Sequence, residues 1–380
     1  MDKVVLSKTP DYSEQTLYES VCRQFACLDY DFTKMKGKRV LIKPNLLMKR
    51  SPEQATTTHP GVIRAVIRRL NELGVEDIVV ADSPGGLYNI GTLTGIYQVS
   101  GMMEAVEGMS AHLNYDVTNG TRQLQGYRRV SSFPLITPVL QADFVISVAK
   151  LKTHGMTMLS GGVKNLFGCV PGLMKPEFHC RFPKKEDFCE MLVDLCECVH
   201  PDLTLVDAVI SMEGDGPSGG TPRHTGYLFG ATNPYALDCV LAQFIGFEED
   251  EIGTIRAAKK RGLCQGGDRI SLCGDTGDFF PVKDFLHPHS KETDFSGNVP
   301  RLFQKPVAFL VGTVAKPRPV IRRSDCVGCG KCAESCPQHT IFVRQGKAHI
   351  QYGNCIRCFC CHEMCPVRAI DIKRFRLFDL

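Results

Sequence analysis

The amino-acid sequence predicts an α/β fold: a larger domain whose mostly parallel sheet is flanked by helices, followed by a small C-terminal α+β domain. Two observations support this prediction. Over most of the chain, short β-branched segments alternate with segments of helical periodicity, as in domains built on a parallel sheet. Closer to the C-terminus, two cysteine-rich segments of equal spacing form an internal repeat. A chain of 380 residues is long enough for two or three domains.

Strands are predicted where short apolar segments are rich in β-branched residues. Five such segments occur, at residues 39–43, 77–82, 143–150, 203–210 and 308–312. Helices are predicted where apolar residues recur with a period of 3.6. Three such segments occur, at residues 61–74, 186–199 and 233–246. In the third, Asn233 is suited to cap the helix and Pro234 to occupy its first turn.

Polar loops follow four of the predicted strands. They are residues 43–45, 82–86, 150–155 and 211–220. Ligands of parallel sheets bind beyond the carboxyl ends of the strands. Any one loop by itself is explained as a turn, but four polar loops at one edge of a sheet predict a shared site.

Three parts are expected along the chain. Residues 1–313 form the α/β domain, and residues 314–325 form a basic linker stiffened by two prolines. Residues 326–380 form the small C-terminal domain, which contains both cysteine-rich segments.

The two cysteine-rich segments, "CVGCGKCAESCP" from Cys326 and "CIRCFCCHEMCP" from Cys355, share the spacing C-x2-C-x2-C-x3-C-P. In this pattern three cysteines bind one iron–sulfur cluster, and the fourth binds the other cluster. One cluster is therefore assigned the ligands Cys326, Cys329, Cys332 and Cys365. The other is assigned Cys355, Cys358, Cys361 and Cys336.

A zinc site is the alternative for such cysteines, but zinc commonly takes two Cys-x2-Cys pairs and four ligands in all. Two quartets of equal spacing favour two [4Fe–4S] clusters. This segment resembles the bacterial two-cluster ferredoxins, in which short strands follow each cysteine motif; "TIFV" and "AIDI" occupy these positions. Cys360 departs from the regular spacing, and we expect it to be a spare thiol.

The densest chemistry outside the cysteines lies in "AKLKTHGMTMLSGGVKNLFG", residues 149–168. Lys150, Lys152, His154, Lys164 and Asn165 fall close together here, with Ser160 and two glycines among them. Glycines and lysines can present backbone N–H groups and ammonium charges to an anion. We therefore predict an anion site, with a solvated turn before an amphipathic helix as the alternative. The spacing does not match an ATP-binding Walker A loop.

Carboxylates supply the opposite charge in the larger domain. Asp82 ends a predicted strand, and Asp238 lies at the edge of the apolar face of its predicted helix. Buried carboxylates need a partner such as lysine or a metal, and they can also act in acid–base chemistry. We select these two ahead of Asp207, Glu213 and Asp215. His59, in "TTTHPG", is interpreted most simply as a turn residue before a helix.

Several segments of the larger domain together resemble the domain-of-unknown-function 362 family: "VLIKPNLL", "TTTHPGVIRAVIRRL", "VVADSPGG", "DFVISVAKLKTHGMTMLSGGVKNLFG" and "NPYALDCVLAQFIG". The resemblance covers roughly residues 38–250, and members of the family often carry a ferredoxin-like module. It implies a site but no settled reaction. The candidate catalytic residues are His154, Asp82, Lys150, Lys164 and Asp238. The candidate substrate-binding residues are Lys43, Asn45, His59, Lys152 and Asn165.

Two main functions remain open from the sequence, beside a third in which the clusters are structural or act as a redox sensor. In the first, the clusters take electrons from a soluble donor and pass them to a small anionic substrate or cofactor bound by the larger domain, as in a reductase. In the second, the protein is a carrier or adaptor whose lysines dock a partner redox enzyme. No nicotinamide or flavin fingerprint of the G-x-G-x-x-G type is present, although a flavin bound without a signature would suit two-electron chemistry.

Composition narrows the setting. A net charge of +4, from 45 basic and 41 acidic residues, is too balanced to indicate nucleic-acid binding. The N-terminal residues contain no apolar stretch of signal-peptide length, and no apolar run approaches that of a membrane span. Nineteen cysteines in a reducing compartment more often bind metal than form disulfides. We therefore expect a cytoplasmic oxidoreductase of anaerobic metabolism, with a soluble electron donor or acceptor as partner.

Overall fold

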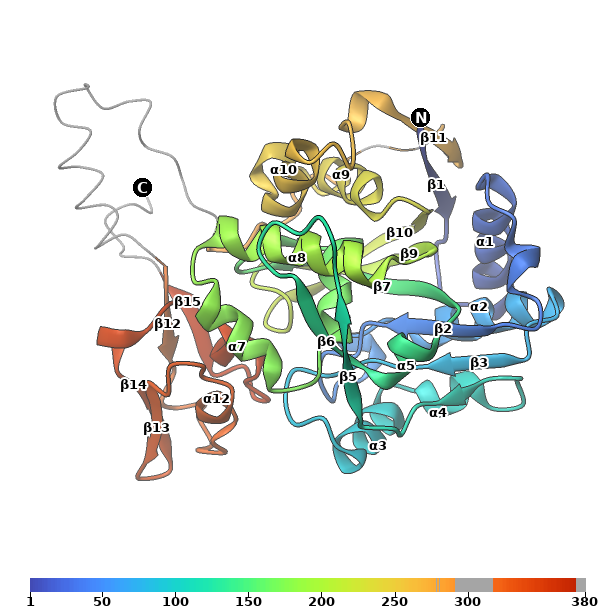
Figure 1. Ribbon diagram of the computed structural model, residues 1–380. Helices are drawn as coiled ribbons and strands as arrows, with labels where there is room; N and C mark the ends of the chain where they lie inside the picture. The colour runs from blue at the N-terminus through green and yellow to red at the C-terminus, as the bar shows by residue number, and fades with distance from the viewer. Residues whose placement is uncertain (278, 280, 291–316, 374–380) are drawn as a thin grey trace, which may run out of the picture.

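A computed structural model describes residues 1–277, 279, 281–290 and 317–373 of the chain. These residues form an α/β domain and a small C-terminal module that packs against one end of its sheet (Figure 1). The strand predicted at 308–312 and the predicted boundary after residue 313 lie outside the described residues.

The central sheet is mostly parallel, as the sequence predicted. Its strand order is β11-β1-β10-β9-β7-β2-β3-β4, and β8 pairs with β7. Strands β3, β2, β7 and β9 are parallel neighbours, whereas β10 runs antiparallel to β9 and to β1. The bounds are β1 (Asp2–Lys8), β2 (Arg39–Pro44), β3 (Asp77–Val80), β4 (His112–Leu113), β7 (Phe144–His154), β8 (Met158–Ser160), β9 (Leu203–Glu213), β10 (Thr221–Ala231) and β11 (Ile270–Gly274).

Helices cover both faces of this sheet. On one face lie α1 (Glu14–Cys27), α2 (Pro60–Glu72), α3 (Ile90–Val99) and α4 (Met102–Val106). On the other lie α5 (Thr137–Gln141), α8 (Lys185–Val199), α9 (Pro234–Phe244) and α10 (Gly253–Lys260). Alternation along β2 explains the two cores: Val40 and Ile42 pack with the first set, and Leu41 packs with the second.

The three predicted helices are present as α2, α8 and α9, within two residues of the predicted bounds. Asn233 caps α9 as predicted, because its side chain accepts hydrogen bonds from the backbone N–H groups of Tyr235 and Ala236. Remaining elements of this domain are β5 (Asn119–Gln123), β6 (Ser132–Ile136), α6 (Gly162–Asn165), α7 (Met174–Arg181) and the short 3-10 helices Phe32–Met35, Pro52–Gln54, Leu166–Cys169, Glu249–Glu251 and Gly267–Arg269.

The C-terminal module contains two antiparallel strand pairs and two single-turn helices. Strand β12 (Arg318–Ile321) pairs with β15 (Ile370–Lys373), and β13 (Ile341–Arg344) pairs with β14 (Lys347–Ile350). The helices are α12 (Lys331–Glu334) and α13 (Cys360–Glu363), and a 3-10 turn spans Tyr352–Asn354. Strand β12 lies in the segment that we predicted as linker, so the structure extends the module's sheet to residue 318.

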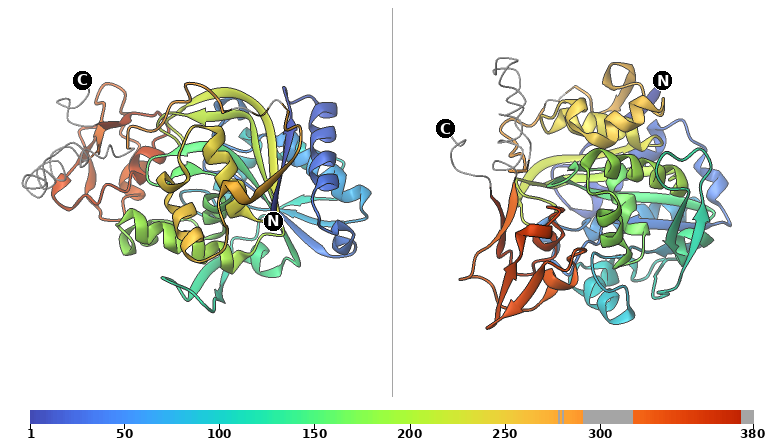
Figure 2. Two further views of the ribbon diagram at one scale, coloured as in Figure 1. Left: turned by 90° about the horizontal axis from the view of Figure 1, so that it is seen from above. Right: turned by 60° about the vertical axis from the view of Figure 1, so that its left-hand side comes forward.

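The module sits at the carboxyl ends of the parallel strands, beside α7 (Figure 2). Loop 214–220, which follows β9, forms much of the contact. The ring nitrogen Nε2 of His362 lies 3.0 Å from the carbonyl oxygen of Asp215, and Ser218 Oγ donates to the carbonyl of Glu363 at 2.7 Å. A Cβ atom at Gly219 would lie 2.5 Å from His362 Cε1, so glycine permits this close approach.

Candidate functional site

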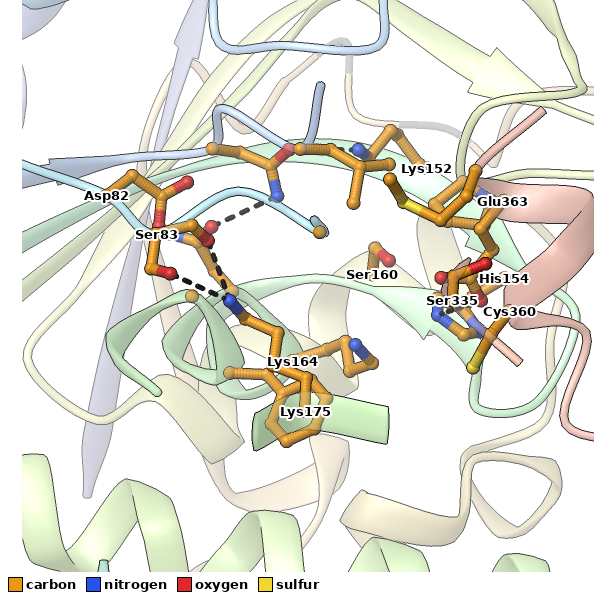
Figure 3. A pocket seen from close by; sticks show the side chains of 18 of the residues that line it. Asp82, Ser83, Lys152, His154, Ser160, Lys164, Lys175, Ser335, Cys360 and Glu363 are labelled. Carbon is orange, nitrogen blue, oxygen red and sulfur yellow. Dashed lines mark hydrogen bonds and ion pairs between the residues drawn. The ribbon is translucent and has the colours of Figure 1, made fainter. Parts of the chain in front are cut away.

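A charged cavity of about 80 Å³ lies where the two parts of the chain meet (Figure 3). The ends of β2, β3 and β7 form one wall, α6 and α7 form the floor, and residues of α13 close the remaining side. In Figure 3, Asp82 and Ser83 face His154, Glu363 and Cys360 across the cavity. The location agrees with the rule for parallel sheets, because the lining residues follow the carboxyl ends of neighbouring strands.

Lys43 and Asp82 form a buried ion pair in this wall. The Lys43 ammonium lies 2.6 Å from Asp82 Oδ1 and also donates to the Pro44 carbonyl and to Asn165 Oδ1. These three contacts use all three ammonium hydrogens. Gly168 makes room for the pair, since a Cβ atom there would lie 2.6 Å from Lys43 Nζ and closer still to Asp82. The pair therefore shapes the wall but has no hydrogen left for a ligand.

Lys152 is the second buried lysine of the cavity, and its contacts with the described residues leave one ammonium hydrogen unused. Its ammonium donates to Asn45 Oδ1 at 3.0 Å and to the Thr56 carbonyl at 2.8 Å. The side chain is 1% exposed. Burial, assisted by the nearby charge of Lys164, lowers the pKa of Lys152 to about 7.

Lys164 lies on α6 and is partly exposed to the cavity. Its Nζ lies 4.6 Å from the ring centroid of Phe167, a cation–π contact. Within the part of the chain that the structure describes, it makes no hydrogen bond and no ion pair. Burial lowers its pKa below the usual value for lysine. Of the predicted lysines, Lys164 is therefore the one with the most hydrogen-bonding capacity to offer a ligand.

His154 ends β7 and points toward the C-terminal module. Its Nδ1 accepts hydrogen bonds from the backbone N–H groups of Met156 and Thr157, so the hydrogen of the neutral ring lies on Nε2. Burial, with the charge of Lys164 nearby, holds the pKa of His154 well below its usual value, and the ring is neutral. Nε2 lies 3.3 Å from Glu363 Oε1, and neither atom has a hydrogen-bond partner among the described residues.

Besides Cys360, the titratable lining residues that the sequence analysis did not select are Lys175, His179 and Glu363. The Lys175 ammonium donates to the carbonyl and hydroxyl of Ser83, at 2.9 and 3.0 Å, and to the Pro84 carbonyl at 3.0 Å. Burial lowers the pKa of Lys175 to about 7 and that of His179 to about 3. No local sequence pattern indicates that Lys175 is a site residue. It lies on α7, and the turn before this helix does not follow a predicted strand.

The structure does not bring Lys150 or His59 into the cavity. Lys150 pairs instead with Asp207 at 2.9 Å and donates to the Tyr12 hydroxyl at 2.8 Å. His59 stacks on Tyr12 with 3.6 Å between ring centroids, and it caps α2. A register shift in the pairing of β7 with β9, between Lys150 and Lys152, separates the two lysines. These groups form a second, internally paired polar cluster.

Asp238 also lies outside the cavity lining. Its carboxylate accepts hydrogen bonds from the backbone N–H groups of Gly162 at 2.7 Å and Val163 at 3.2 Å. Burial raises its pKa to about 7. A Cβ atom at Gly161 would come within 2.9 Å of Asp238 Cγ, which explains the glycine pair. Asp238 thus anchors the first turn of α6 and positions Lys164 indirectly.

The eight predicted cysteine ligands line two small apolar cavities of the C-terminal module. Cys326, Cys329, Cys332 and Cys365 line one, together with Ile321 and Ile370 among others. Cys336, Cys355, Cys358 and Cys361 line the other. Each cavity therefore receives three cysteines from one motif and one from the other, which is the division that the spacing predicted.

The surroundings of these cysteines fit iron–sulfur clusters. Backbone N–H groups of Ala348, Thr340 and Ala369 donate to the sulfur atoms of Cys326, Cys336 and Cys365 at 3.4, 3.4 and 3.1 Å. Such hydrogen bonds stabilise thiolate charge and tune cluster potentials. Cys360 lines the charged cavity rather than either cysteine-lined cavity.

Among the residues that the structure describes, no helix has the length and apolar character to span a membrane.

Comparisons with known proteins agree with this organisation. Residues 40–243 match the family described as "Domain of unknown function (DUF362)", and residues 318–366 match the "4Fe-4S dicluster domain". The thylakoid-associated protein sll1697 of Synechocystis is 33% identical over 228 residues, which are 60% of this chain and 69% of that protein.

Two solved structures are more distant. The lactate racemase apoprotein of Thermoanaerobacterium thermosaccharolyticum has a TM-score of 0.40 and 13% identity, over 62% of this chain and 55% of that one. A Thermotoga maritima protein has a TM-score of 0.36 and 12% identity, over 58% and 56% of the two chains.

The 4Fe–4S dicluster match supports an iron–sulfur electron-transfer role for the C-terminal module. The match over residues 40–243, more than half of the 380-residue chain, establishes the family of the larger domain. The chain therefore belongs to the DUF362 family and carries a 4Fe–4S dicluster domain after its α/β domain.

Proposed function

We propose that this protein reduces a small anionic organic substrate in the charged cavity, using electrons that arrive through two [4Fe–4S] clusters. One observation supports the proposal. The same cavity is lined by residues that are adjacent in sequence to the cysteine ligands and by lysines that have unused ammonium hydrogens. Ser335 and Cys360, next in sequence to Cys336 and Cys361, share it with Lys152 and Lys164. A substrate bound there would contact residues that are adjacent in sequence to the proposed ligands of one cluster.

We assign one cluster to Cys326, Cys329, Cys332 and Cys365 and the other to Cys336, Cys355, Cys358 and Cys361. The cavity linings support this assignment, because each holds one thiolate for each iron of a cubane. Such clusters supply electrons one at a time when bound. The second set of cysteines adjoins the charged cavity, and the exposed Cys329 of the first set faces solvent, where a soluble donor can approach.

Charge in the cavity favours an anion. Four lysines and two carboxylates line it, and one carboxylate, Asp82, is already paired with Lys43. Within the described parts of the chain, the unused lysine hydrogens belong to Lys164 and Lys152, and the neutral ring of His154 presents one more N–H. These donors can hold a carboxylate or phosphate. Burial of the cavity excludes water and strengthens each of these contacts.

Protons can come from the same lysines. A two-electron reduction consumes two electrons, supplied through the soluble donor, and two protons. An ammonium group whose pKa is about 7, such as that of Lys152, is well matched to proton donation at neutral pH. His154 is neutral and serves as a hydrogen-bond donor that polarises the substrate. Asp82 holds Lys43 in place and does not need to exchange a proton itself.

The carrier alternative requires exposed lysines that an acidic partner can reach. Lys43, Lys150 and Lys152 are each at most 1% exposed, which favours a cavity for a small molecule over a docking face.

The proposal places the protein in the cytoplasm with a soluble electron donor. A flavin is not required to hold the anion. If one is present, acid precipitation of the purified protein will release it as a yellow supernatant.

The test begins with protein purified without oxygen, for which we expect about eight iron atoms per chain. Acetate and inorganic phosphate are then titrated by calorimetry, and melting temperature is followed as their concentration rises. Saturable binding that disappears in Lys164→Gln supports the proposed site. Protein that carries its iron but binds neither anion in either assay would refute it.

A further inference from the structure

A second cavity adjoins the charged one and is larger, about 300 Å³. It lies between loop 84–87, helix α3 and helix α12. Its apolar lining includes Leu47, Met48, Ile96, Leu173 and Met364. Gly86, Gly91 and Gly95 expose backbone along another part of the wall.

The two cavities meet at a common boundary. Leu47, Gly85, Ser335 and Met364 line both of them. Two of these residues belong to the α/β domain and two to the C-terminal module. A Cβ atom at Gly85 would lie 2.8 Å from Met364 Sδ, so the boundary consists of a bare backbone facing a flexible thioether. A Met side chain can change rotamer at low cost, so one molecule can extend through this boundary into both cavities.

The volumes of the two cavities determine which part of a substrate each cavity can hold. An apolar cavity of about 150 Å³ can hold a benzene molecule. The charged cavity, at about 80 Å³, is too small for a ring but large enough for a carboxylate or phosphate. The second cavity, at about 300 Å³, has room for a body of one or two rings.

The distribution of charged groups also indicates that the smaller cavity binds the anionic part of the substrate. The unspent lysine hydrogens described above face the smaller cavity. The charged residues that line the larger cavity are Lys49 and the pair Lys331–Glu334, whose charged atoms lie 2.8 Å apart, and all three residues are exposed at its edge. Its inner wall is apolar, and Leu87 adds a side chain that is 43% exposed.

We propose that the substrate is an organic acid in two parts: a compact anionic head bound by Lys164 and Lys152, and an apolar body of one to two rings in the second cavity. This inference rests on the proposed function, because it extends the same site. The head places the reacting part of the molecule beside the cysteine-bearing helix α13. The body supplies most of the apolar area buried on binding, and hence most of the selectivity among acids.

Calorimetry with three probes tests the inference on anaerobically purified, iron-loaded protein. The probes are acetate, 4-phenylbutyrate and the uncharged 4-phenylbutyramide. We expect 4-phenylbutyrate to bind at least about tenfold more tightly than acetate, since its phenyl ring and methylene groups leave water when they enter the second cavity. The amide should bind about tenfold more weakly than the acid, because it cannot pair with the lysines.

A pair of variants locates the body. A Cβ atom at Gly91, the second residue of α3, would meet only Asn89 Oδ1, at an ordinary contact distance of 3.7 Å. Gly91→Leu should therefore fill part of the second cavity without harming the helix. Gln98→Leu adds the same side chain at an exposed position of α3 that is not part of the lining. Gly91→Leu should abolish the advantage of 4-phenylbutyrate over acetate, and Gln98→Leu should retain it.

The outcomes separate the two proposals. If acetate binds and 4-phenylbutyrate binds no better, the two-part substrate is refuted while the anion site stands. An advantage of 4-phenylbutyrate that survives in Gly91→Leu also refutes it, because the body would then lie elsewhere. If no anion binds to iron-loaded protein, the proposed function itself fails.

Discussion

His154 and Glu363 approach to 3.3 Å, between Nε2 of the imidazole and Oε1 of the carboxylate. His154 ends a central strand of the α/β domain, and Glu363 ends the helix that begins next to a cysteine ligand. The two residues come from the two different parts of the chain and meet at the wall of the charged cavity. The cavity is therefore complete only when the module is docked, which places the iron–sulfur module directly at the proposed substrate site.

Neutralising the free lysines should remove anion binding without loss of iron. We expect Lys164→Gln and Lys152→Gln each to weaken binding of acetate or phosphate by about tenfold to a hundredfold, since each removes a charge-assisted hydrogen bond. Calorimetry measures the affinity, and iron analysis measures cluster content. Lys260→Gln, at an exposed position in the last turn of α10, is the matched control. Loss of iron in either cavity variant would contradict the separation of lysine and cysteine sites.

Anion affinity should fall as pH rises through about 7. Burial lowers the pKa of Lys152 to about 7, and an anion binds its ammonium form. Below this pH Lys152 is already protonated, so affinity changes little. Above it, binding must take up a proton, and affinity drops by up to about tenfold per pH unit for each proton. Calorimetry in buffers of different ionisation enthalpy counts the protons. A pH-independent affinity between about 6 and 9 in the unmodified protein would show that Lys152 does not contact the anion.

Gly168→Ala should destabilise the α/β domain by about 2 kcal/mol or more, because the added methyl group collides with the Lys43–Asp82 pair. Separating the partners of a buried ion pair is costly. Urea unfolding measures the change. Gly277→Ala is the control, because that exposed glycine has open space around it and should shift stability by less than about 0.5 kcal/mol. Equal stability of the two variants would mean that the wall of the charged cavity accommodates the added methyl group without separating Lys43 from Asp82.

Docking of the module should depend on the close contact at loop 214–220. Gly219→Val would place a side chain where His362 Cε1 now lies 2.5 Å from the Cβ position. We expect faster proteolysis between the two parts and weaker anion binding, with iron content unchanged. Ser324→Ala, a change at an exposed module residue, should alter neither quantity. Unchanged anion binding in a variant whose module has become protease-sensitive would show that the module does not complete the cavity.

The sequence was informative wherever a local pattern determined the structure. The β-branched strands and the period of α2, α8 and α9 predicted the layers of the sheet. Lys43, Asn45, Asp82, Lys152 and His154 were predicted as a site because they follow parallel strands, and the structure brings these five together. Strands β11, β1 and β10, which lie together at one side of the sheet, were not predicted, and β10 contains proline and glycine, which weaken a strand pattern.

Long-range packing decided the rest. Lys150 and Lys152 are two residues apart and would share a strand face in a regular strand, but the register shift against β9 sends Lys150 to Asp207. Glu363 and Lys175 reach the cavity only because the module and α7 dock there, and no spacing in the sequence records that contact. Asp238 was selected for its position on an apolar helix face, and the structure gives it two backbone partners instead.

The neighbouring thiols Cys360 and Cys361 test the assignment of cluster ligands. Cys361 lines a cysteine cavity with three other proposed ligands, whereas Cys360 faces the charged cavity. Cys361→Ser should therefore lower the iron content from about eight to about four atoms per chain, because one cubane loses a thiolate. Cys360→Ser should retain all of the iron and the visible absorption of the clusters. Since the two substitutions are chemically equal and adjacent, a general effect on folding would appear in both. Iron loss in Cys360→Ser alone would exchange the roles of the two residues, and it would move the second cluster toward the lysines.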